Sequence, residues 1–132
     1  MQRVRIPILL VFCLFASEAR ATARDAALVY FIPFDVETYV AVTRNDIIAQ
    51  AWEKWTVVDG AAINRLARLF KPTNKQEFNE AKVRCLVILK GERYFIDANG
   101  IALKDGGTSL SVDRARFLAF GDSIAKNRAR LH

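Results

Sequence analysis

Alternating and continuous hydrophobic positions mark the clearest strands of this chain. Residues 83–90 read VRCLVILK, a run of apolar and β-branched side chains with the composition of a buried strand. Residues 94–98 and 101–103 form two further short runs on either side of Asn99-Gly100, a pair that tolerates the positive φ angles of a two-residue hairpin. The pattern predicts an antiparallel meander of three strands.

An earlier strand region extends from Leu28 to Val42. It is rich in β-branched and aromatic residues, but Pro33 interrupts it, and proline lacks the N–H group that a central strand requires. Apolar and more polar positions alternate with period two over residues 36–42. We therefore expect an extended segment that is broken or bulged at Pro33, with its better strand over residues 36–42.

Apolar residues at helical spacing predict a helix over residues 44–55. Thr43 occupies a favourable N-cap position, and Asp46 places negative charge in the first turn, which the helix dipole favours. The apolar stripe recurs at a period of 3.6 residues and consists of Ile47, Ile48, Ala51, Trp52 and Trp55. The same stripe explains both tryptophans as cover for the sheet, and their use in binding is the alternative.

A second helix is expected after Asp59, which can cap it, and it should end before Pro72. Asn74, followed by Glu77 three residues later, can start a short third helical turn that carries Phe78.

The last helix is expected to begin at Ser111 or Asp113 and to run to about Arg130. Its apolar positions lie near helical spacing, and its basic residues mostly point outward as a solvated face. The predicted order is β-α-α-β-β-β-α. This order indicates an α+β domain, with a small antiparallel sheet and the helices packed on one face.

The first 23 residues form a separate segment. Arg3 and Arg5 precede an apolar run over residues 6–16, and Ala21 and Ala23 give a small-x-small cleavage site. This is the order of a secretory signal peptide, and the run is too short to span a bilayer. We expect residues 24–132 to be one globular domain, located in the periplasm or secreted, with no stable membrane insertion.

Charge and cysteine content narrow the class of protein. The chain carries a net charge of +6, but three arginines and one glutamate lie in the first 23 residues, so the remainder carries +4. That excess favours solubility and does not call for a nucleic-acid partner. Without the leader, Cys85 is the only cysteine, which excludes an internal disulfide.

Candidate catalytic groups are few. The single histidine is His132, at the end of the chain, so histidine-based catalysis and a zinc site are not expected. Cys85 lies in an apolar strand row, which predicts a packing role. Asp97 begins a sequence that superficially resembles a calcium loop, but the spacing fits a hairpin turn instead. We expect no metal and no cofactor.

Paired carboxylates are the remaining enzymatic option, because two of them can hydrolyse a glycosidic bond. Asp35 and Glu37 would share one face of an extended segment, and Asp97 and Asp105 flank the second hairpin. A small cell-envelope hydrolase that uses Asp35, Glu37 or Asp97 is therefore an alternative, and an envelope assembly accessory is another.

Two resemblances bear on function. The segment GERYFIDANGIAL resembles hairpins of many small bacterial envelope proteins, and this resemblance identifies turn chemistry. The profile of a short exported domain without catalytic residues resembles periplasmic immunity proteins, which implies inhibition of a toxin as one possible role.

We accordingly expect a non-enzymatic domain that binds another envelope or secreted protein, as an inhibitor or immunity-type protein. The expected contact surface combines the aromatic segment over residues 30–39 with charges around the second hairpin. Its candidate residues are Tyr30, Phe34, Asp35, Glu37, Tyr39, Arg93 and Asp97.

Overall fold

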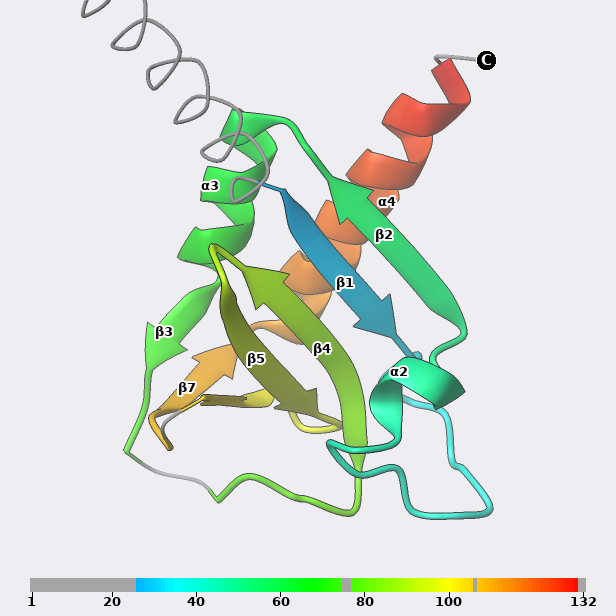
Figure 1. Cartoon of the computed structure of the whole chain (residues 1–132), viewed down its shortest axis with the longest axis vertical. Coiled ribbons are helices and arrows are strands. Elements are labelled where there is room, and N and C mark those ends of the chain that lie inside the picture. Colours follow the sequence, from blue (N-terminus) through cyan, green and yellow to red (C-terminus); the bar gives the residue numbers. More distant parts are fainter. Residues whose placement is uncertain (1–25, 75–76, 106, 131–132) are drawn as a thin grey trace, which may run out of the picture.

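The computed structural model describes residues 26–74, 77–105 and 107–130, with side chains described as far as Ile124. Seven antiparallel strands form one open sheet in the order β2-β1-β4-β5-β6-β7-β3 (Figure 1). The strands are β1 (Ala27–Phe31), β2 (Glu53–Val57), β3 (Phe70–Pro72), β4 (Val83–Leu89), β5 (Glu92–Asp97), β6 (Ile101–Lys104) and β7 (Ser109–Val112). The helices are α2 (Ile47–Gln50), α3 (Gly60–Arg68) and α4 (Arg114–Arg130).

The predicted meander is confirmed. Strands β4, β5 and β6 pair in sequence order, and the hairpin turn at Asn99-Gly100 joins the last two. Gly100 has a φ of +85°, and a Cβ there would lie 2.5 Å from the Val112 carbonyl oxygen. Glycine is therefore required by both the turn and the close approach of β7.

Helices α3 and α4 cover one face of the sheet, which we call the α4 face. Both begin at the predicted aspartates: a carboxylate oxygen of Asp59 accepts from the Ala62 N–H at 3.2 Å, and one of Asp113 accepts from the Arg116 N–H at 3.0 Å. Phe117 of α4 is fully buried, and its ring centroid lies within 5.9 Å of those of Phe31, Phe34 and Trp55. This face holds the larger core.

The opposite side of the sheet, the α2 face, holds a smaller core. Helix α2 and the connection over residues 32–46 cover part of it, and Figure 1 shows α2 in front of the sheet with α4 behind. The buried residues are Ile32, Val42, Ile47, Val83, Leu86 and Phe95. The prediction that all helices pack on one face is correct for α3 and α4 and wrong for α2.

The segment between β1 and α3 differs most from prediction. Residues 36–42 form no strand, and only Val42 makes an isolated bridge, to Lys82. The predicted helix over residues 44–55 is reduced to the four residues of α2, and Glu53–Val57 forms the edge strand β2, paired with β1. Pairing with β1 overrides the helical periodicity of this segment.

Two short strands were not predicted. β3 pairs with β7, which adds both to the end of the meander, so the described residues around Phe78 form no helix. The sheet curls at this end, because the rings of Phe70 in β3 and Tyr94 in β5 have centroids only 4.5 Å apart.

A glycine in the middle of α4 determines how β2 packs. A Cβ at Gly121 would lie 2.3 Å from the Trp55 indole, so only glycine allows this contact. Trp55 therefore packs on the α4 face, whereas Trp52 remains 63% exposed. The two tryptophans do not share one helical stripe.

Candidate binding surface

Large apolar side chains are exposed on the segment that covers the α2 face. Tyr39 and Val40 are exposed by 109% and 77%, and Ile48 and Trp52 by 58% and 63%. Helix α2 is too short to bury more than one side of itself, so Ile47 is buried and Ile48 is not. Exposed apolar side chains grouped in this way are typical of interaction surfaces.

Tyr39 and Val40 belong to a lobe formed by residues 35–41, which projects beyond α2 in Figure 1. Hydrogen bonds hold both of its ends. The Val36 carbonyl accepts from Nη2 of Arg84 at 3.1 Å, and the Val42 carbonyl accepts from the Val83 N–H at 2.9 Å. Within the lobe, the Thr38 hydroxyl donates to the Val40 carbonyl at 2.7 Å. The exposed residues are thus carried on an anchored base.

Arg84 is the main anchor and was not identified from the sequence. Its side chain is only 2% exposed, and it donates from Nη1 to the Val83 carbonyl at 3.1 Å as well as to Val36. No ion pair joins it to a carboxylate among the described residues, and its Nε has no hydrogen-bond partner there. A buried cation is thus used to hold the lobe, although burial of an unpaired charge is unfavourable.

Arginines and carboxylates surround Phe95 on the same face. The guanidinium carbons of Arg44 and Arg93 lie 5.9 and 5.8 Å from the centroid of the Phe95 ring. Each Nε is 2.8 Å from a carboxylate oxygen, of Glu80 and Asp105 respectively. These residues line a polar cavity of about 260 Å³. The predicted Arg93 therefore lies on the α2 face, in a charge-balanced cluster.

Tyr30 also lies on the α2 face. It is partly buried against the smaller core, and Lys54 Nζ lies 5.4 Å from the centroid of its ring. Its cross-strand partners are Lys54 in β2 and Leu86 in β4. Tyr30 thus continues this surface from the lobe onto the sheet.

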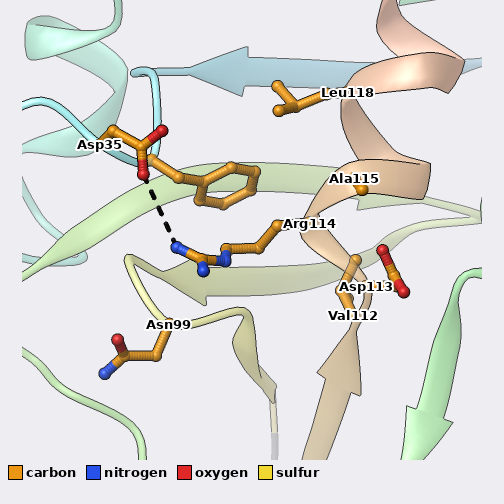
Figure 2. A pocket seen from close by; sticks show the side chains of 8 residues that line it. Asp35, Asn99, Val112, Asp113, Arg114, Ala115 and Leu118 are labelled. Carbon is orange, nitrogen blue, oxygen red and sulfur yellow. Dashed lines mark ion pairs between the residues drawn. The ribbon is translucent and has the colours of Figure 1, made fainter.

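Phe34 and Asp35 contribute to a separate cavity of about 460 Å³, shown in Figure 2. Asp35 and Arg114 point toward each other there, with Asp35 Oδ1 3.8 Å from Nη1 of Arg114, and the same nitrogen donates to the Ala98 carbonyl at 3.2 Å. Asn99 lies on the neighbouring hairpin (Figure 2). The structure thus brings the start of the aromatic segment next to the second hairpin, as predicted, with α4 between them.

Two carboxylates line this cavity. Figure 2 shows Asp113 directed away from the Asp35–Arg114 pair, and its Oδ1 caps α4. Asp35 faces the cavity with its side chain 94% exposed. Hydrolysis of a glycosidic bond requires two carboxyl groups facing one space, and among the described lining residues Asp35 alone does so.

Asp97 is fully buried, so its predicted place on a contact surface is wrong. Its Oδ1 accepts from the N–H groups of Asn99 and Ile101, both at 2.9 Å. Its Oδ2 accepts from the Asn79 N–H, also at 2.9 Å. The side chain closes the hairpin and holds the chain before β4, which is a structural role.

The remaining candidate groups have structural positions or lie outside the described residues. Burial raises the pKa of the Cys85 thiol well above its usual range, which agrees with the predicted packing role. His132 and the leader lie outside the described residues. Within the described ranges, no cluster of three or more histidine, cysteine, aspartate or glutamate side chains can hold a metal, and no helix is long and apolar enough to cross a membrane.

The chain matches no family model, no curated protein and no solved structure with which it was compared.

The seven predicted residues therefore separate into three groups. Tyr30, Glu37, Tyr39 and Arg93 belong to the α2 face or its lobe, Phe34 and Asp35 line the cavity of Figure 2, and Asp97 is buried. Val40, Ile48 and Arg44 were missed as surface residues. The strand assigned to residues 36–42 concealed the lobe, and Pro33 was the one sequence signal that favoured a loop there.

Proposed function

We propose that this chain is an exported protein-binding domain, of the inhibitor or immunity type, that contacts its partner through the α2 face. The observation that carries the proposal is the exposure of Tyr39, Val40, Ile48 and Trp52 within one stretch of 14 residues. Aromatic side chains on a preformed surface are favoured at the centre of protein interfaces, because they bury a large area with little loss of conformational entropy.

The surroundings of these residues support the same function. Arg84 and the bridge at Val42 hold the base of the lobe, which lowers the entropy lost on binding. The Arg44–Glu80 and Arg93–Asp105 pairs supply a polar rim that can select a partner by charge. Apolar centre and polar rim together are the usual anatomy of a protein interface.

Site-specific photo-crosslinking in the native host tests the proposal. A photoreactive phenylalanine analogue at Tyr39 or Trp52 is expected to capture one defined protein. The matched control is the same analogue at Asn64, which is exposed on α3 and belongs to the opposite face. Equal capture at Asn64, or no capture at Tyr39 and Trp52, would contradict the proposal. A crosslinked homodimer would favour the assembly accessory instead.

Export is tested separately, by the mass of the protein recovered from its host. The leader should be absent, so the chain should begin near Arg24 and contain one thiol, that of Cys85, after denaturation. An intact Met1 with two thiols would contradict export and leave the crosslinking result unaffected.

The hydrolase alternative now depends on Asp35 and Glu37, because Asp97 is buried. Cleavage of a cell-wall glycan by the purified protein, lost in both Asp35→Asn and Glu37→Gln, would favour it over binding.

A further inference from the structure

The α4 face carries a groove that differs in charge from the surface proposed above. Two adjoining cavities, of about 270 and 320 Å³, share Leu69 and Arg116 and lie between α3, β3 and the first half of α4. We call this feature the α3–α4 groove. Its cations are Arg65, Arg68, Lys71 and Arg116, and its apolar floor includes Leu69 and Phe120.

These four cations have no carboxylate partners. None of them forms an ion pair with any described residue, in contrast to Arg44, Arg93, Lys104 and Arg114. The one carboxylate among the described lining residues is Asp113, whose Oδ1 already accepts from the Arg116 N–H. The groove therefore presents an excess of positive charge, exposed to solvent.

Stability of the fold does not explain Arg116. It lies in the first turn of α4, where the helix dipole disfavours a cation, and that turn contains no acidic residue. Arg114, in the same turn, is compensated by Asp35 and the Ala98 carbonyl, whereas Arg116 is not. Its uncompensated charge is available for a ligand.

The floor of the groove is apolar and fixed. Phe120 is only 7% exposed, and the guanidinium carbon of Arg65 lies 5.8 Å from the centroid of its ring, which joins α3 to α4. A ligand suited to this site would combine negative charges for the rim with an apolar side chain for the floor.

From this geometry we infer that the α3–α4 groove binds an acidic peptide segment of a partner protein, in which carboxylates alternate with apolar side chains. A membrane surface fits less well, because peripheral binding requires apolar side chains that protrude beside the cations. The most exposed large apolar side chains, those of Tyr39 and Val40, lie on the lobe instead. This site is independent of the α2 face.

Peptide selection tests the inference directly. A random 12-residue peptide library displayed on phage is selected on the full chain and on the double variant Arg68→Gln/Arg116→Gln. Peptides rich in aspartate and glutamate, with interspersed leucine or phenylalanine, should be enriched on the full chain. A synthetic peptide of the enriched sequence should bind the double variant about tenfold more weakly, and 0.5 M salt should weaken binding to the full chain.

Two further variants complete the experiment. Lys54→Gln/Lys82→Gln removes the same number of exposed charges outside the groove and should bind the peptide as the full chain does. Ala119→Glu adds bulk and negative charge at an exposed position of the groove and should abolish binding. Thermal melting of each variant checks that the fold is retained.

Several outcomes would overturn the inference. They are enrichment of neutral or basic peptides, enrichment of no peptide, or equal binding by the full chain and the Arg68→Gln/Arg116→Gln variant. Phosphatidylglycerol vesicles form the second arm, and binding to vesicles without any enrichment of acidic peptides would assign the groove to a membrane surface instead.

Discussion

The two faces of the sheet differ in what covers them and in what they expose. On the α4 face, two helices close over seventeen buried residues among those described, whereas the α2 face buries six beneath a four-residue helix and an irregular connection. The thinner cover carries Tyr39, Val40, Ile48 and Trp52 at the surface. The comparison teaches that the α4 core supports the fold, while the α2 face can present apolar side chains without contributing equally to stability.

The largest expected effect is that of Phe117→Ala. This fully buried ring contacts three other aromatic rings of the α4 core, so its removal should lower the free energy of unfolding by about 3–5 kcal/mol, as measured by urea denaturation. Ile47→Ala on the α2 face should cost less, about 2 kcal/mol, because α2 can rearrange locally. A greater loss for Ile47→Ala would reverse the comparison of the two cores.

Asp97→Asn should have the next largest effect, because this side chain ties the hairpin to the chain that precedes β4. The carboxylate accepts three backbone N–H groups, and an amide in its place turns one acceptor into a donor facing a donor. We expect a loss of about 2 kcal/mol in the free energy of unfolding. Asp35→Asn, at an exposed carboxylate, is the matched control and should leave the unfolding curve unchanged.

Gly121→Ala should destabilise the protein, although alanine favours a helix by about 1 kcal/mol over glycine. The added Cβ would overlap the Trp55 ring, so we expect a net loss of about 1–2 kcal/mol in thermal unfolding. Gly60→Ala is the control, since nothing lies within 4 Å of a Cβ there. A stabilised Gly121→Ala variant would show that β2 and α4 are not packed as described. The loss should shrink in Trp55→Leu.

The smallest expected effect concerns Glu92, Tyr94 and Lys104 at the end of β5 and β6. Hydrogen bonds from Lys104 and Tyr94 lower the pKa of Glu92 below its ordinary 4.5, and the hydrogen bond to Glu92 raises that of Lys104 above 10.5. Stabilisation by this pair should therefore be complete between these two ordinary values. It should decline as pH falls through the lowered pKa of Glu92 or rises through the raised pKa of Lys104.

Glu92→Gln tests this pair. It should lower the melting temperature slightly at pH 7, and the difference from the unmodified protein should disappear at acid pH, where Glu92 is protonated in both states. A difference that grows toward low pH would contradict the assigned direction of the Glu92 pKa shift.

Local signals made much of the α4 face predictable. Asp59 and Asp113 mark the starts of α3 and α4, and Asn99-Gly100 marks a hairpin, because each acts through hydrogen bonds or φ angles within a few residues. The buried strand β4 also follows from its composition alone. These features need no knowledge of distant partners.

The α2 face was less predictable because its elements depend on distant partners. Glu53–Val57 shares its apolar spacing with a helix, and only pairing with β1 makes it a strand. β3 has three residues and gains its identity from β7, about 40 residues later. Nothing near Arg84 in the sequence indicates that it is buried beneath the lobe, so the exposed positions of Val40 and Ile48 could not be derived.

The contact between Gly121 and Trp55 also gives the molecule two built-in optical reporters. The Trp55 indole lies against α4 and the aromatic core, whereas the Trp52 indole is open to solvent at the end of α2. An aqueous quencher such as iodide should therefore extinguish the red-shifted emission of Trp52 first and leave the bluer emission of Trp55 until α4 detaches. Fluorescence of the unlabelled protein can thus follow occupancy of the α2 face and docking of the last helix as two separate signals.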